Sequence, residues 1–219
     1  MFNLKDIFRQ GLIIPFILLY ALSGMAFGGE QYSFSWAFIH KSRAGQVGSL
    51  AFEAAEPISE GELLRFYLEL HGGAFVYLYL FDARQDLYLV FPPSTAFYNG
   101  EVPAGYKTYI PSGRKWFALD GLKGTERFYL LASAERLVEL ERLTEMFLAA
   151  GNLELKTRLL AKLDEAAENL FAASVSEVER LPIRPGEMPG GGDSAKTVGA
   201  HKISATDGGY GRVLDLVNK

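Results

Sequence analysis

The sequence predicts an α+β protein: a mostly antiparallel β-sandwich or partly open barrel with a C-terminal helical hairpin packed on it and a returning C-terminal β-hairpin. Three observations predict this class. Up to about residue 133, short aromatic and β-branched runs alternate with turn residues, which is typical of strands. After residue 133, apolar residues recur every three or four positions, as in amphipathic helices. Near the C-terminus, two apolar runs flank an Asp-Gly step, which favours a turn between strands.

Eight short segments before residue 133 have the pattern of strands. In the first segment Tyr32, Phe34, Trp36 and Phe38 share one face, because side chains alternate along a strand, and we expect that face to be buried. Two of the segments are joined by the polar residues 82–86, a connector of hairpin length. The expected strands cover residues 32–39, 50–54, 63–70, 75–81, 87–91, 106–110, 116–119 and 127–131, with a turn at residues 56–61.

The segment 75–81 is apolar on both faces. Phe75, Tyr77, Tyr79 and Phe81 lie on one face, and valine and leucine fill the other. Such a strand is typical of the centre of a sheet that is covered on both sides, so we expect these aromatic residues in the core beneath the helices. The alternative is an exposed stacking platform for a sugar or a peptide, since tyrosine combines apolar area with a polar tip.

Two amphipathic helices follow the strands. In the first, Leu137, Leu140, Leu143 and Phe147 share a face, with Ser133 as the expected N-cap and glutamates, Glu141 among them, on the polar remainder. Gly151 and Asn152 end this helix and begin the second. The predicted division of the chain is a β-rich domain at 29–133, a helical hairpin at 134–181, a Pro/Gly-rich linker at 182–196 and returning strands at 197–219.

The first 28 residues have the layout of a signal peptide. Lys5 and Arg9 precede an apolar run at 12–22, and Ala26 and Gly28 stand at the −3 and −1 positions of a cleavage site before Gly29. The alternative is an uncleaved anchor, because residues 11–29 carry no charge and are long enough to span a bilayer. Both interpretations place the body of the protein outside the cytoplasm, as a periplasmic or secreted protein with a possible inner-membrane anchor.

Composition excludes several classes of function. The chain contains no cysteine, which rules out disulfides, thiolate catalysis and cysteine-ligated metals. Its formal net charge of −4 and its lack of a basic patch argue against nucleic-acid binding. We expect no cofactor and no metal. Contact with a membrane is expected only through the N-terminal segment, should it remain uncleaved.

Few local motifs suggest chemistry. Residues 190–197 nearly satisfy a phosphate-binding loop, but Ala195 replaces the required glycine and the expected strand and helix do not flank the segment. His40, His71 and His201 lack the paired spacing of a zinc site and have no neighbouring partner in the sequence. The pair Asp82 and Asp86 is ordinary turn chemistry. No nucleophile elbow of the form Gly-x-Ser-x-Gly occurs.

The middle of the chain resembles a known family. The runs at 58–66, 76–82 and 89–92, then Asn99-Gly100, 102–105, 110–111, and 124–128 leading to 131–133, are similar in order and type to the bacterial family called domain of unknown function 4384. The resemblance covers roughly residues 55–133. It implies a strand-rich module that occurs in exported proteins and, elsewhere, beside kinase or caspase-like domains. That family assigns no catalytic residues, so the resemblance implies none here.

The sequence therefore favours a non-catalytic module of the bacterial cell envelope, which binds an unknown envelope protein, glycan or peptide. Recognition sites often lie on loops held by a rigid scaffold, so the loop 92–105 with Phe97, Tyr98 and Asn99 is the candidate binding surface. No catalytic residue is assigned. The alternative is an extracytoplasmic hydrolase whose carboxylates come together only in the folded protein; a cleft holding two carboxylates within catalytic reach would favour it.

Overall fold

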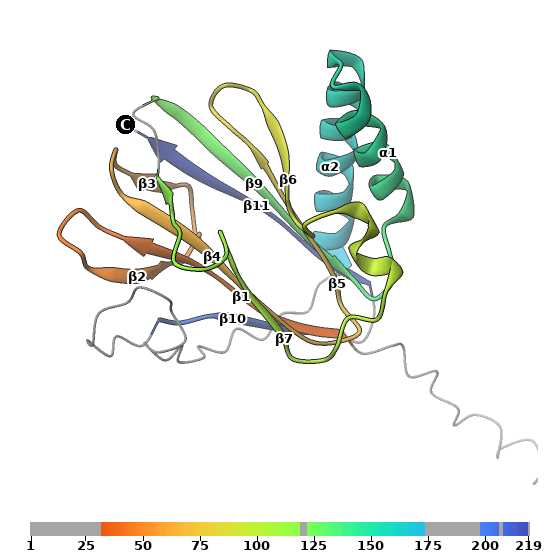
Figure 1. Cartoon of the computed structure of the whole chain (residues 1–219), viewed down its shortest axis with the longest axis horizontal. Helices are drawn as coiled ribbons and strands as arrows, with labels where there is room; N and C mark the ends of the chain where they lie inside the picture. Colours follow the sequence, from red (N-terminus) through yellow and green to blue (C-terminus); the bar gives the residue numbers. More distant parts are fainter. Residues whose placement is uncertain (1–31, 119–121, 174–197, 206–207, 219) are drawn as a thin grey trace, which may run out of the picture.

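Two β-sheets pack face to face, and two helices form a third layer on one of them (Figure 1). The structure is a computed structural model, and it describes residues 32–118, 122–173, 198–205 and 208–218. The predicted signal peptide, the linker at 182–196 and the motif at 190–197 lie outside these residues. The predicted class is confirmed: a mostly antiparallel two-sheet fold followed by two packed helices, with the last two strands returning to the sheets.

The first sheet has six strands. Its order is β10–β1–β4–β7, with β2 paired to β1 and β8 paired to β4, and every pair is antiparallel. These strands are β1 (Tyr32–Lys41), β2 (Val47–Leu50), β4 (Leu63–Gly72), β7 (Tyr106–Ile110), β8 (Phe117–Ala118) and β10 (His201–Ala205).

The second sheet has five strands in the order β3–β11–β9–β5–β6. All its pairs are antiparallel except the short parallel pair of β3 and β11. The strands are β3 (Glu56–Ile58), β5 (Phe75–Phe81), β6 (Leu87–Phe91), β9 (Gly124–Ser133) and β11 (Gly209–Asn218). The predicted bounds of β5, β6 and β7 are confirmed. The predicted turn at 56–61 contains the short strand β3, whose parallel pairing with the distant β11 no local pattern indicates. The strand predicted at 50–54 lies earlier in the chain, as β2.

Strand β1 is buried on both faces. Tyr32, Phe34, Trp36 and Phe38 point into the sandwich as predicted. The expectation of a single buried face is wrong, because Ala37 and Ile39 on the other face are also buried, in a smaller apolar cluster that includes Val198. The residues just before β10 therefore cover part of the outer face of the six-stranded sheet.

The aromatic strand β5 lies in the core, as predicted. Val76 and Leu78 face the sandwich interior, and Tyr77 and Tyr79 on the opposite face lie beneath the helices, where both are almost fully buried. This arrangement excludes the stacking platform at Tyr77 and Tyr79, since neither ring is accessible. Burial raises the pKa of both tyrosines, so each hydroxyl remains a neutral hydrogen-bonding group.

The helices are α1 (Val138–Ala150) and α2 (Leu153–Ala173), and the turn between them is as predicted. Gly151 has a left-handed conformation with φ of 62°, and its N–H donates to the carbonyl of Phe147 at 2.7 Å. Asn152 Oδ1 caps the second helix by accepting from Leu155 N–H at 2.9 Å. Ser133 is not an N-cap: it ends β9, because pairing to β5 and β11 carries that strand further than its apolar run suggests.

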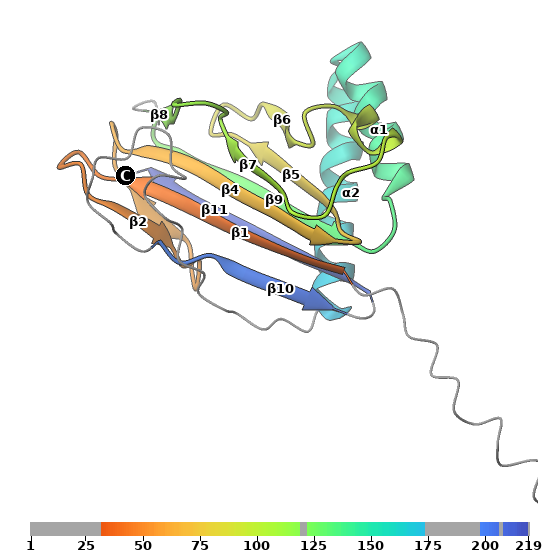
Figure 2. The same ribbon diagram turned by 60° about the horizontal axis from the view of Figure 1, so that its bottom comes forward.

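The last two strands return to the protein, but they do not form a β-hairpin. Strand β10 pairs with β1 at the edge of the six-stranded sheet (Figure 2). Strand β11 instead inserts between β3 and β9 in the other sheet. Pairing with β9 over ten residues buries Leu214 and Leu216, which pairing with β10 alone would not do. Close packing against α2 requires glycine in β11, because a Cβ on Gly211 would lie 2.5 Å from the carbonyl oxygen of Ala167.

Candidate functional site

The predicted binding loop folds back onto the protein as a short helix, η2 (Thr95–Asn99). The hydroxyl of Tyr98 accepts from Val76 N–H at 2.8 Å and donates to the Val76 carbonyl at 2.6 Å, and the residue is only 6% exposed. Phe97 is half-buried and packs edge-on against Phe91. Asn99 is exposed and accepts a hydrogen bond from Arg136. Of the three predicted binding residues, Tyr98 is therefore no exposed anchor, and partner binding by this loop stays a prediction.

A buried polar network fastens α1 to the five-stranded sheet. Tyr77 OH donates to Glu141 Oε1 at 2.6 Å, and Tyr79 OH shares a 2.8 Å hydrogen bond with Thr144 Oγ1. Arg136 forms an ion pair with Glu141 and also reaches Asn99. The prediction that Glu141 lies on the solvent side of the helix is wrong, because Glu141 is buried against Tyr77 of the sheet. Helical periodicity alone does not indicate such a contact between distant elements.

The six-stranded sheet holds a serine, a histidine and a glutamate in contact on its outer face. Ser35 Oγ lies 2.7 Å from His71 Nε2, and His71 Nδ1 lies 3.9 Å from Glu69 Oε1. Glu69 is in turn contacted by the Tyr67 hydroxyl and by Lys107. In a Ser–His–carboxylate triad the histidine likewise faces the serine with Nε2 and the carboxylate with Nδ1. No local sequence pattern indicates this contact, because Ser35 and His71 come from different strands and are 36 positions apart.

The burial of Ser35 argues against nucleophilic catalysis. This residue is 0% exposed, so its hydroxyl cannot meet a substrate in this conformation. Strand β1 also pairs with β4 and β10 on its two edges beside Ser35, so the nearby backbone amides belong to the sheet ladder and not to an oxyanion hole. The three residues therefore form a cross-strand polar network on the outer face of the sheet.

The other two histidines also have structural partners. His40 Nε2 lies 3.1 Å from Glu62 Oε2, and the ring of His201 stacks on Trp36 with 4.4 Å between centroids. Within the described part of the chain, no group of three or more His, Asp or Glu side chains could hold a metal ion. Asp82 has the turn role that the sequence predicts, since its Oδ1 accepts from the N–H of Arg84 and of Asp86.

Arg65 is buried on the same outer face. Its guanidinium donates to the carbonyls of Pro111, at 3.1 Å, and Gly113, and its Cζ lies 4.9 Å from the centroid of the Tyr109 ring and 5.6 Å from that of Trp116. Desolvation by burial lowers the pKa of Arg65, and an electrostatic interaction with Tyr109 opposes that shift. The cation fixes the loop after β7, which is a structural role.

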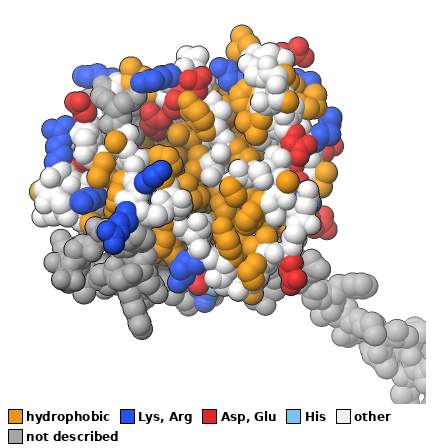
Figure 3. Space-filling model, in the orientation of Figure 1, with side chains coloured by type: hydrophobic (Ala, Val, Ile, Leu, Met, Phe, Trp, Pro, Cys, Tyr) orange, Lys and Arg blue, Asp and Glu red, His pale blue; other side chains and the backbone are white. Residues whose placement is uncertain are grey.

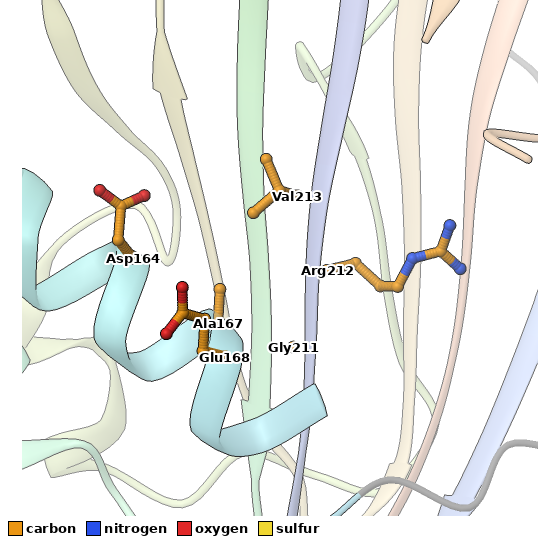
Figure 4. A pocket seen from close by; sticks show the side chains of 6 residues that line it. All are labelled: Asp164, Ala167, Glu168, Gly211, Arg212 and Val213. Atoms are coloured by element: carbon orange, nitrogen blue, oxygen red, sulfur yellow. The ribbon is translucent and has the colours of Figure 1, made fainter. Parts of the chain in front are cut away.

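A cleft of about 430 Å³ lies between α2 and β11. Two carboxylates, Asp164 and Glu168, stand four residues apart on α2 and point to the same side, with Val213 of β11 opposite (Figure 4). Asp164 Oδ1 accepts from the hydroxyl of Tyr129 at 2.8 Å. Arg212 also lines the cleft, but its side chain points away from the carboxylates (Figure 4).

The helical layer carries the most exposed apolar side chains of the described residues. Leu153 is 71% exposed, Val138 62% and Leu148 56%, and Met146 also faces solvent. Hydrophobic side chains lie on the outside of the helices and across the middle of the same face (Figure 3). Leu148 and Leu153 flank the turn between the helices, so we call them, with Met146, the hairpin tip. No helix in the described ranges is long and apolar enough to cross a membrane.

The described residues form a β-sandwich module with a helical layer on one sheet. Comparison with known families matches residues 58–136, less than half of the chain, to a family described as a domain of unknown function, DUF4384. The resemblance expected from the sequence is thereby confirmed, with bounds three residues later. No curated protein and no solved structure matches the chain. The matched domain runs from the end of β3 to Arg136, whereas β1, β11 and the helices lie outside it.

Proposed function

We propose that this protein is a non-catalytic, extracytoplasmic interaction module of the bacterial cell envelope, which binds its partner through the helical layer. One observation carries the proposal: the three most exposed large apolar residues among those described, Val138, Leu148 and Leu153, all lie on the helical hairpin. Exposed apolar side chains that gather at one place, as Leu148 and Leu153 do on either side of the helical turn, are typical of protein contact sites. The signal-like N-terminal segment supports a location outside the cytoplasm.

The polar groups that resemble catalytic ones support the same proposal. Ser35 is inaccessible, and Tyr77, Glu141 and Arg136 satisfy one another inside the protein. Polar groups that are buried and hydrogen-bonded to one another stabilise a fold, and they are not accessible to a substrate. Among the described residues, the large apolar side chains most available for contact lie on the helices.

The α2–β11 cleft bears on the alternative, an extracytoplasmic hydrolase, because it holds two carboxylates. Hydrolysis of a glycosidic bond needs a carboxyl group on each side of the bond. Asp164 and Glu168 are on one helix and point to one side of the cleft, so they cannot flank a substrate (Figure 4). This geometry suits the binding of a ligand better than its cleavage.

Replacing the hairpin tip tests the proposal. The double variant Leu148→Glu, Leu153→Glu in the full-length protein is expected to enrich its partner from envelope extract about tenfold less than wild type, because each apolar anchor contributes about 1 kcal/mol or more to an interface. Quantitative mass spectrometry of the captured material measures the enrichment.

The matched control is Phe117→Glu, which changes a residue that is 38% exposed on strand β8 of the other sheet. This variant is expected to capture the partner as wild type does, and all the variants should have wild-type melting temperatures. Capture that is reduced equally by both substitutions, or by neither, would show that the hairpin tip is not the contact surface.

A further inference from the structure

We propose that the cleft between α2 and β11 binds a basic segment of a partner protein, in which a lysine or arginine stands beside apolar residues. The inference rests on the proposed binding function and adds a second contact surface with a stated chemistry. The cleft has an acidic wall from α2 and an apolar floor from β11, and its volume of about 430 Å³ leaves room for side chains of a bound segment.

The acidic wall is held in place by the sheet beneath it. Asp164 and Glu168 share one face of α2 because they are four residues apart. The hydroxyl of Tyr129 donates to Asp164 Oδ1 at 2.8 Å and orients that carboxylate toward the cleft edge. Burial, reinforced by this hydrogen bond, raises the pKa of Tyr129 to about 12, so the hydroxyl remains a donor at neutral pH.

The floor is the part of β11 that the helix leaves uncovered. Gly209 and Gly211 lie directly under α2, where a Cβ would collide with Leu170 and Ala167. Val213 is the next residue on that face and is 42% exposed. An apolar side chain of this size beside two carboxylates favours a ligand that is apolar along its length and cationic at one point.

Two arginines near the cleft have other partners. Arg127 forms a two-point ion pair with Asp215, with N–O distances of 2.9 and 3.0 Å. Arg212 points away from the carboxylates and donates to the Phe52 carbonyl at 2.8 Å (Figure 4). Two carboxylates against one arginine leave the described lining of the cleft with an excess of negative charge, and charge complementarity selects a basic partner segment.

Direct binding of defined peptides tests this inference. A fluorescein-labelled peptide of alternating lysine and leucine is expected to bind the full-length protein, as measured by fluorescence anisotropy at low and at moderate salt. The double variant Asp164→Asn, Glu168→Gln should weaken binding about tenfold, and salt should weaken binding to wild type, since partly exposed ion pairs are screened. Asparagine can still accept from Tyr129, so the variant should keep the wild-type melting temperature.

Glu165→Gln is the matched control, because Glu165 lies on the same helix but pairs with Lys162. It should bind the peptide as wild type does. The inference is overturned if the lysine peptide does not bind, if a glutamate–leucine peptide binds as tightly, or if the double variant binds unchanged. Failure of the proposed function has a different signature: loss of the hairpin-tip effect on partner capture, with peptide binding at the cleft intact.

Discussion

Removing residues 193–219 is expected to abolish the cooperative thermal unfolding of the protein. The deletion takes away β10 and β11, and β11 is an interior strand of its sheet, between β3 and β9. Tyr210, Leu214 and Leu216 are buried there, and each such side chain contributes about 2 kcal/mol or more of hydrophobic stabilisation. Together with the lost ladder, this approaches the total stability of a typical domain, about 5 to 15 kcal/mol. Calorimetry measures the transition.

A synthetic peptide of residues 198–219 provides the control for that deletion. Added to the truncated protein, it should restore a cooperative transition, because it supplies both missing strands. A truncated protein that melts as wild type does would contradict the placement of β11 within the sheet, and the C-terminal strands would then be dispensable for the core.

Replacing Arg136 with alanine is expected to lower the free energy of unfolding by about 3 kcal/mol, because it leaves the buried carboxylate of Glu141 without its cation. Arg136 is the last residue of the family match, and it joins Asn99 of the loop to α1. The substitution should therefore loosen the helical layer where it meets the matched domain. Urea denaturation followed by circular dichroism gives the difference.

Two further variants distinguish the loss of the Arg136–Glu141 ion pair from the effect of removing any arginine side chain. Arg142→Ala removes an exposed arginine from the same helix and should change stability by less than about 0.5 kcal/mol. The double variant Arg136→Ala, Glu141→Gln should recover part of the loss, since glutamine still accepts from Tyr77 without a charge. If Arg136→Ala costs no more than Arg142→Ala, the pair with Glu141 does not hold the hairpin.

The local patterns of this sequence were sufficient for much of the fold. The aromatic alternation of Phe75–Phe81 and the polar connector after it define β5, β6 and their turn, because both signals are local. Gly151 and Asn152 define the turn between the helices for the same reason: a left-handed glycine and an asparagine cap act within a few residues. The burial of Tyr77 and Tyr79 follows from a strand that is apolar on both faces.

The features that the sequence did not reveal depend on pairing over long distances. The Asp-Gly step predicts a hairpin turn, but β10 and β11 belong to different sheets. Strand β10 pairs with β1, and β11 pairs with β9. Ser35 meets His71 only through the register of β1 on β4. The loop with Phe97 and Tyr98 turns inward because Tyr98 satisfies both backbone groups of Val76, a contact that no spacing in the sequence encodes.

Site-specific photo-crosslinking in intact cells tests most directly whether the helical layer is the contact surface. A benzoylphenylalanine at position 153, on the hairpin tip, is compared with one at position 117, on the outer strand β8. The account predicts a discrete crosslinked product from position 153 and none from position 117. A protein that is exported normally, yet gives no product from position 153 or the same products from both positions, would contradict it.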